Sequence, residues 1–319
     1  AEMRIDLAPG QVSGTGPYGA VNRGSDRVDW VSTENMRWYQ TAFTAEGMWN
    51  VRDIVKSYKA GQKVSTSYFG PVVRPYVGNG YWAPRRQDDS LSINIPAQAD
   101  GANPDRTGAL DADGTTYTGA LYADGKKVRD VTGQAPPWTD VPAGKHRLRY
   151  EISNGHDGTW LSTSTKVETA WEFESGGDLG DGFLPMLQAY YGFDLAADGS
   201  AGANRKKGQT VPFTLQLSHI DGAIGSAPVK SATLEMRLPG GEWKKVDLKT
   251  ESISKDGPGK MTDIFTKGHV FEASFSAQLP VPDAGGFIDL RVTGVDEAGN
   301  TVSQQIEKAV EVSAARGAK

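Results

Sequence analysis

The stretch that decides the fold runs from residue 285 to residue 305, with the sequence GGFIDLRVTGVDEAGNTVSQQ. Its first part alternates apolar side chains with polar ones: Ile288, Leu290 and Val292 against Asp289, Arg291 and Thr293. This two-residue period predicts a strand with one buried and one wetted face. Residues 296–300 contain Gly299 and side chains that can bond their own backbone, and an extended run resumes at Thr301. The stretch therefore predicts a β-hairpin, in which no residue is chemically reactive.

The composition extends this prediction to the whole chain. Its 319 residues exceed the usual size of one domain and include 39 Gly and 17 Pro. Such a content of Gly and Pro, with abundant Thr, Ser, Asp and Asn, is typical of many short strands joined by tight turns. We therefore predict an all-β protein. One helix is predicted, over residues 50–60, where Val51, Ile54, Val55 and Tyr58 fall at helical spacing.

The best candidate for a domain boundary is the polar, Gly-rich stretch ESGGDLGDG at 174–182. Alternating segments predict about seven strands on each side of it, as in an immunoglobulin-like or fibronectin-like sandwich. We predict two such antiparallel β-sandwich domains in tandem, an aromatic-rich one over 29–175 and a second over 183–312. An extended arm is expected over 1–28 and a frayed tail over 313–319.

Three classes of protein are excluded by what the sequence lacks. The chain has no Cys, which excludes disulfides, thiolate nucleophiles and cysteine-based metal sites. Its formal net charge is −5 and no basic run is longer than Arg205–Lys207, so we expect no binding to nucleic acid. No apolar run approaches the roughly 20 residues that a transmembrane helix needs, so we expect no membrane span.

The opening hairpin belongs to a set of motifs that carry a family resemblance. Val281-Pro282-x-x-Gly285 leads into Leu290-Arg291-Val292, and Asp296-x-x-Gly299-Asn300-Thr301-Val302 follows. The earlier half adds further motifs: Tyr58-Lys59-Ala60-Gly61, Phe69-Gly70-Pro71, the run Arg85–Asp89, and Ser164–Val167 before Trp171–Phe173. Together they resemble the C-terminal extension of large secreted subtilisin-like serine peptidases from Streptomyces-type actinobacteria.

This resemblance implies an accessory region without catalytic activity. Peptidases of that family need an Asp, a His followed by Gly-Thr, and a Ser inside Gly-Thr-Ser-Met-Ala, and none of these motifs occurs in the 319 residues. The resemblance further implies a secreted, extracellular protein whose partner is the peptidase domain or a protein substrate. The implied roles are docking, substrate capture or attachment to the cell surface, with no cofactor.

Other catalytic motifs are also missing from the sequence. A nucleophile elbow needs Gly-x-Ser-x-Gly, and no such pentapeptide occurs. The four histidines are scattered, without the His-x-x-x-His or His-Glu-x-x-His spacing of a zinc site: His146, His156, His219 and His269. We predict that all four are ordinary surface or edge-strand residues and that the chain is not an enzyme.

Two groups of residues are candidates for binding. Tyr76, Tyr81 and Trp82 lie in a Gly- and Pro-rich segment where flat rings could stack on a sugar, although rings that cap the sandwich core are the favoured alternative. Asp111 and Asp113 place two carboxylates in a short loop suited to calcium, but no Glu stands at the twelfth position of an EF-hand loop. For this loop we favour turn residues that bond their own backbone.

The sequence therefore predicts a non-enzymatic binding protein. Two further hypotheses remain open. One is a carbohydrate-binding β-sandwich module with cell-wall polysaccharide as its ligand. The other is an inhibitor or a substrate of another secreted enzyme.

Overall fold

The structure is a computed structural model, and it describes twelve ranges of the chain: residues 2–6, 11–15, 22–23, 27–30, 40–44, 49–53, 63–78, 83–110, 114–133, 136–158, 161–258 and 268–317. These residues form strands, loops and a short 3-10 turn at Gly177–Leu179, and no α-helix. The prediction of an all-β protein is confirmed. The helix predicted over 50–60 is wrong for residues 50–52, which belong to strand β6, because Trp49 and Val51 are buried and alternate with more exposed neighbours. Residues 54–60 lie outside the described ranges.

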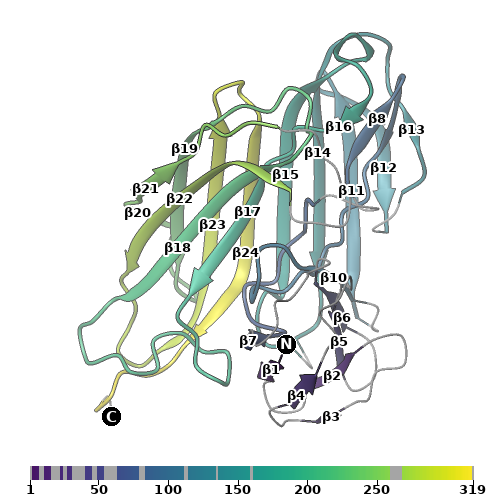
Figure 1. Ribbon diagram of the computed structural model, residues 1–319. Coiled ribbons are helices and arrows are strands. Elements are labelled where there is room, and N and C mark those ends of the chain that lie inside the picture. Colours follow the sequence, from purple (N-terminus) through teal and green to yellow (C-terminus); the bar gives the residue numbers. More distant parts are fainter. Residues whose placement is uncertain are drawn as a thin grey trace.

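An eight-stranded antiparallel sheet runs through both predicted halves (Figure 1). Its strands, in spatial order, are β12 (Lys126–Thr132), β11 (Thr116–Ala123), β14 (His146–Gly155), β15 (Lys166–Ser175), β24 (Thr301–Val312), β23 (Gly286–Asp296), β19 (Val229–Arg237) and β20 (Lys244–Val246). The first four strands come from the earlier half of the chain and the last four from the later half. The long sheet is thus built equally by the two halves.

Two four-stranded sheets lie against this long sheet. Sheet one consists of β13 (Thr139–Asp140), β9 (Ser90–Ser92), β8 (Arg85–Gln87) and β16 (Gly182–Phe183). Sheet two consists of β17 (Gln188–Phe193), β18 (Val211–Ile220), β22 (His269–Leu279) and β21 (Lys249–Ile253). Hydrogen bonds cross between the layers, from Arg86 to Ser175 and from Tyr191 to Gln304. Figure 1 shows sheet two in front of β23 and β24.

Two smaller sheets carry the N-terminal part of the chain. One has the order β4-β1-β7 and the other β10-β6-β5-β2-β3. Their bounds are β1 (Glu2–Asp6), β2 (Gln11–Thr15), β3 (Asn22–Arg23), β4 (Arg27–Trp30), β5 (Gln40–Thr44), β6 (Trp49–Arg52), β7 (Lys63–Ser67) and β10 (Thr107–Leu110). The region predicted as an extended arm, 1–28, thus contains strands that pair within these sheets.

The hairpin predicted at 285–305 is confirmed. Strands β23 and β24 are paired along their length, from Val295 opposite Thr301 next to the turn to Gly286 opposite Val312. The apolar positions Ile288, Leu290 and Val292 are buried. One detail of the prediction is wrong, because Asp289 is buried and not wetted. Asp289 is opposite Arg237 in the register of β23 with β19, and Arg237 Nε donates to it at 2.7 Å. Where β23 shifts register against β24, between Ile288 and Leu290, Lys308 N also donates to Asp289, at 2.7 Å.

The predicted boundary at 174–182 lies between strands, but the long sheet and the hydrophobic core include residues from both sides of it. Strand β15 ends at Ser175, and it pairs with β24 from Lys166 opposite Glu307 to Glu172 opposite Thr301. A single hydrophobic cluster also joins the two sides, since Trp171 and Phe213 belong to it together. The two predicted sandwich domains therefore share one sheet and one core, and their immunoglobulin-like or fibronectin-like character stays a prediction.

Candidate functional site

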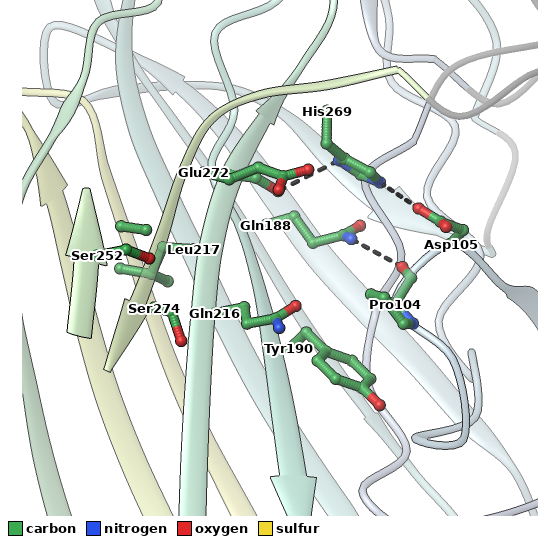
Figure 2. A pocket seen from close by; sticks show the side chains of 12 residues that line it. Pro104, Asp105, Gln188, Tyr190, Gln216, Leu217, Ser252, His269, Glu272 and Ser274 are labelled. Carbon is green, nitrogen blue, oxygen red and sulfur yellow. Dashed lines mark hydrogen bonds and ion pairs between the residues drawn. The ribbon is translucent and has the colours of Figure 1, made fainter. Parts of the chain in front are cut away.

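A polar pocket lies on the outer face of sheet two, and we call it the His269 pocket (Figure 2). Its volume is about 190 Å³. It is lined by Pro104, Asp105, Gln188, Tyr190, Gln216, Leu217, Ser218, Ser252, His269, Glu272, Ala273 and Ser274. Because one water molecule takes up about 30 Å³ of liquid volume, the pocket has room for a small polar group and its stem.

The alternation of three strands builds the floor of this pocket. Tyr191, Leu215 and Phe275 face the core, so their neighbours Tyr190, Gln216 and Ser274 project from the opposite face of sheet two. These three polar residues lie side by side, since Tyr190 pairs with Gln216 and Gln216 with Ser274. A row of polar side chains across the outer face therefore follows from the two-residue period of the strands.

A β-bulge in β22 lies at the end of the pocket, opposite Ser218. Strand β18 shifts register against β22 between Leu217 and His219, so that Ser218 is opposite two residues of β22. One of these two, Phe271, has a positive φ of 52°. Ser218 keeps the regular alternation of β18 and points to the outer face like Gln216, whereas His219 is buried like Leu217. The extra residue lies in β22, where it changes the alternation and places His269 on the outer face.

His269 lies between a serine and an aspartate. Its Nδ1 is 3.2 Å from Ser218 Oγ, and its Nε2 is 3.1 Å from Asp105 Oδ1. Figure 2 shows His269 and Asp105 facing each other, and both side chains are largely buried. These residues come from β22, β18 and the loop before β10, so no motif of neighbouring residues could predict the arrangement.

The loop that supplies Asp105 is held by a fully buried arginine. Arg74 Nε donates to Ala189 O at 2.8 Å, Nη1 to Asp100 O at 3.2 Å and Nη2 to Pro104 O at 3.1 Å. Burial lowers the pKa of Arg74, because the charged form loses its hydration. A buried guanidinium is costly unless its donors are satisfied, and here backbone carbonyls satisfy each of these three nitrogens. Arg74 thus fixes the wall of the pocket against β17.

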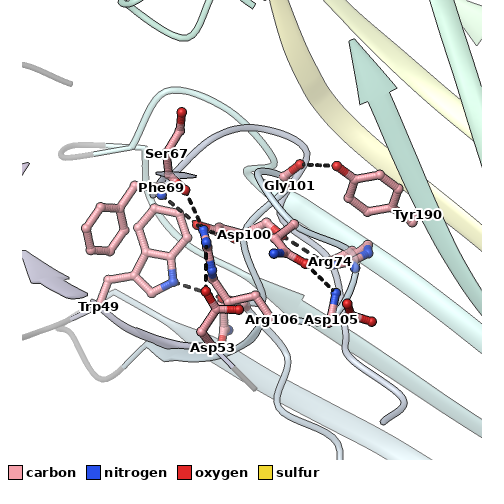
Figure 3. A network of polar contacts seen from close by, with 12 residues as sticks. Trp49, Asp53, Ser67, Phe69, Arg74, Asp100, Gly101, Asp105, Arg106 and Tyr190 are labelled. Atoms are coloured by element: carbon pink, nitrogen blue, oxygen red, sulfur yellow. Dashed lines mark hydrogen bonds and ion pairs between the residues drawn. The ribbon is translucent and has the colours of Figure 1, made fainter. Parts of the chain in front are cut away.

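A second buried arginine supports the same loop from behind (Figure 3). Arg106 forms ion pairs with Asp100 at 2.9 Å and with Asp53 at 3.5 Å, and its guanidinium lies 3.9 Å from the centre of the Tyr68 ring. Burial opposes the charge of Arg106, but the two carboxylates outweigh it and raise its pKa. Phe69 N donates to Asp100 as well, at 2.6 Å. The loop from Asp100 to Arg106 is therefore pinned on two sides.

The prediction that all four histidines are surface or edge-strand residues is wrong for two of them. His219 is 0% exposed, and its Nε2 lies 3.1 Å from the buried Asp296. His269 lies in β22, which has β18 on one side and β21 on the other. His219 is buried because it continues the inward-facing series of Leu215 and Leu217 in β18, a strand with partners on both sides. His269 follows the β-bulge in β22, which changes the face to which its side chain points.

The predicted binding residues do not meet in the His269 pocket. Tyr76 is only 3% exposed, and burial raises the pKa of its hydroxyl. Its ring occupies the space where a Cβ on Gly78 would be, 2.0 Å from the ring atoms. Tyr76 therefore packs as part of the core, as the favoured alternative stated, and offers no stacking face. Tyr81 and Trp82 lie outside the described residues.

The predicted calcium ligands Asp111 and Asp113 also lie outside the described residues. Within the ranges that the structure describes, no three side chains of His, Cys, Asp or Glu are grouped as a metal site would require. The turn at 296–300 is described, and there Asn300 N donates to Asp296 Oδ1 at 2.7 Å. The interpretation of these residues as turn residues that bond their own backbone is confirmed.

One exposed aromatic residue was missed by the sequence analysis. Trp138 is 42% exposed, and the Arg85 guanidinium lies 5.5 Å from the centre of its ring. The signal that could have found it is its position directly after Pro136 and Pro137, in a loop before β13. An exposed indole is the kind of surface that a sugar ring could use.

No protein-family model matches the chain, and no curated protein matches it. In the part of the chain that is described, no helix has both the length and the apolar character needed to cross a membrane.

Proposed function

We propose that this chain is a non-catalytic binding unit, an accessory region of a secreted subtilisin-like serine peptidase that captures protein substrate through the His269 pocket. The observation that carries the proposal is the pocket itself, a polar hollow on a sheet face whose wall is fixed by the buried Arg74. A wall fixed before the ligand arrives lowers the entropy lost on binding. A binding role therefore gives a reason why the buried Arg74 holds a loop at the surface.

The proposal is tested by measuring binding of the full chain to unfolded casein and to an inactivated subtilisin-type peptidase. We expect binding to at least one of the two. Ser274→Arg, which fills the pocket, should weaken it about tenfold or more, because the bulky side chain excludes the ligand. Ser303→Arg is the matched control, since Ser303 is exposed on β24 in the long sheet.

Two outcomes would contradict this proposal. One is the absence of binding to either protein, and the other is equal binding by both variants. Retention of the chain on chitin, cellulose or peptidoglycan, abolished by Trp138→Ala, would favour the carbohydrate-binding hypothesis instead.

A second candidate function is acyl hydrolysis, which the arrangement of Ser218, His269 and Asp105 favours. Ser218 Oγ would attack an ester carbonyl while its proton passes to His269 Nδ1, which returns it to the leaving alkoxide; water would then release the acid from the acyl-serine. This candidate is second because Ser218 lies within β18 between two partner strands, where backbone N–H groups are engaged in the sheet ladder and a pair of oxyanion donors is hard to supply.

A fluorophosphonate probe separates the two candidates. Labelling of the full chain that is lost in Ser218→Ala and kept in Ser276→Ala would establish a reactive serine and reverse our order of preference. Absence of labelling, together with no hydrolysis of a p-nitrophenyl ester, would eliminate the hydrolase.

A further inference from the structure

A second hollow lies on the outer face of the long sheet, over β11, β14 and β15, and we call it the sheet trough. Its volume is about 520 Å³, within the range of about 300 to 1,000 Å³ that is usual for ligand sites. Tyr150 and Trp171 are buried on the inner face of the sheet, so the adjacent Glu151 and Ala170 project from the outer face. The sheet trough and the His269 pocket therefore lie on the outer faces of different layers.

Small side chains form the floor of the sheet trough. Ala120 is paired with Glu151 and Glu151 with Ala170, so the three residues stand in one row across the strands. Glu151 leans out of this row, because its carboxylate accepts hydrogen bonds from Tyr122 Oη at 3.1 Å and from Arg149 Nε at 2.9 Å. The two alanines therefore leave a hollow between rows of longer side chains.

Hydrogen bonds between strands hold both walls of the sheet trough. In one wall, Gln305 Nε2 donates to Glu168 Oε2 at 3.2 Å, and Gln305 Oε1 accepts from Arg291 Nη2 at 2.9 Å. In the other wall, Arg149 Nη1 donates to Glu172 Oε1 at 2.7 Å. Glu168 and Glu172 lie four residues apart on β15, which separates the backbones beneath the two walls by about 13 Å. The sheet trough therefore runs across the strands.

The charges that line the sheet trough are balanced and paired within the protein. Each of the six charged side chains in its lining forms an ion pair, in the pairs Lys127–Asp130, Arg149–Glu151, Arg291–Glu235 and Glu168–Lys166. A paired carboxylate or guanidinium keeps further acceptor or donor positions. Hydroxyl groups can use positions of both kinds, because each hydroxyl donates and accepts. The lining therefore favours an uncharged ligand that is rich in hydroxyl groups.

The position of the sheet trough does not suit a peptide. Peptides are commonly recognised at a free strand edge, in an apolar groove or by a cluster of arginines. The floor lies inside the long sheet, where β11, β14 and β15 each pair with a strand on both sides. Tyr122 adds an aromatic ring to the lining, and such a ring can pack against the face of a sugar.

We propose that the sheet trough binds a neutral glycan, whose sugar rings lie in a row across β11, β14 and β15. The side chains of the two walls bond the sugar hydroxyls, and one sugar ring packs against Tyr122. Walls that are hydrogen-bonded before the ligand arrives lose less side-chain entropy on binding. This inference does not rest on the proposed function, because it concerns a different face of the molecule and a different ligand.

The test measures binding of the full chain by calorimetry to three neutral hexasaccharides, cellohexaose, N-acetylchitohexaose and mannohexaose, and to the anionic hexagalacturonate. We expect at least one neutral hexasaccharide to bind, at least tenfold more tightly than its own monosaccharide and than hexagalacturonate. Ala170→Arg should weaken this binding at least tenfold, because the long side chain fills the floor. Gln305→Ala, which removes one polar group from a wall, should weaken it several-fold.

Thr233→Arg is the matched control, since Thr233 is exposed on β19 of the same sheet and does not line the sheet trough. Circular dichroism checks that each variant is folded. The inference would be overturned if no neutral hexasaccharide bound, if hexagalacturonate bound most tightly, or if Ala170→Arg and Gln305→Ala bound as well as Thr233→Arg. Binding lost in Trp138→Ala but kept in Ala170→Arg would also overturn it and place the glycan at Trp138.

Discussion

At the scale of single residues, the surroundings of His146 and His156 shift their pKa values in opposite directions. His146 Nδ1 lies 2.6 Å from Asp124 Oδ2 and its Nε2 lies 3.0 Å from Ala143 O. Both partners are acceptors, so only the doubly protonated imidazolium satisfies both contacts. The hydrogen bond to Asp124, aided by the Ala143 carbonyl, raises the pKa of His146.

His156 shows the reverse arrangement. Its Nδ1 accepts a hydrogen bond from Gly158 N at 3.2 Å, while its Nε2 lies 3.2 Å from Thr163 O, as a neutral imidazole requires. Burial lowers the pKa of His156, because desolvation disfavours the imidazolium. The sequence contains both histidines but does not distinguish them.

We therefore predict that His146 titrates above the ordinary histidine pKa of about 6.5 and His156 below it. The stabilisation of the fold by His146 is complete below pH 6.5 and disappears as the pH rises through the folded-state pKa of His146. The stabilisation by neutral His156 is complete above pH 6.5 and disappears as the pH falls through the folded-state pKa of His156. NMR titration of the imidazole protons measures both. Asp124→Asn should bring the pKa of His146 back toward 6.5 and leave His156 unchanged, and a His146 pKa at or below that of His156 would refute the prediction.

At the scale of an element, the turn between β23 and β24 is held by buried side chains. Asn300 Nδ2 donates to Asp296 Oδ2 at 2.7 Å and to Gly225 O at 3.0 Å. The same carboxylate lies 3.1 Å from His219 Nε2. The hairpin that defines the fold is thus tied to the end of β18 and to the loop before β19.

We predict that Asn300→Ala lowers the free energy of unfolding by about 2 to 3 kcal/mol, because it removes buried hydrogen bonds, one of them to a carboxylate. Glu297→Ala, in the exposed part of the same turn, should change it by less than about 0.5 kcal/mol. Urea unfolding followed by circular dichroism measures both values. Equal effects of the two variants would show that the buried side-chain contacts do not hold the turn.

At the scale of the whole molecule, the pairing of β15 with β24 joins the two halves. Residues about 140 positions apart form this seam, as with Lys166 and Glu307. The core continues across it, and Tyr191 and Gln304 are hydrogen-bonded between layers at 2.7 Å. Each half supplies four of the eight strands, so the long sheet is complete only when both halves are folded.

We predict that the chain unfolds in a single transition. Seven of the eight Trp residues precede residue 175, so tryptophan fluorescence reports mainly on the first half, while circular dichroism reports on both. The two signals should change at the same urea concentration, because the shared sheet and core couple the halves. Two separate transitions would mean that the halves are independent domains.

A proline in the seam provides a control for this coupling. Ser303→Pro removes a ladder N–H in a central strand and leaves its partner carbonyl unpaired, at a cost of about 1 to 3 kcal/mol, and should move both signals together. Lys245→Pro, in the edge strand β20, should have a smaller effect, since edge strands tolerate proline. A seam variant that shifts only one of the two signals would contradict the coupling.

Local patterns in the sequence were enough for the strands and hairpins. The alternation of Ile288, Leu290 and Val292 and the turn chemistry of Asp296 and Asn300 act between residues close in the chain, so their outcome can be predicted from sequence. The helical spacing over 50–60 shows the limit of this approach, because β6 makes its backbone hydrogen bonds to β5 and β10 and its buried face decides its structure.

By itself, then, the sequence determined an all-β chain, the places where the main hairpins turn, and the absence of cysteine chemistry. Only the tertiary structure decided that β15 pairs with β24, that Tyr76 is buried, and that Ser218, Asp105 and His269 meet in one pocket. The physical reason is distance along the chain. A strand chooses its partner, and a bulge re-aims its side chains, according to which arrangement buries the most apolar surface of the whole molecule, and no local pattern records that choice.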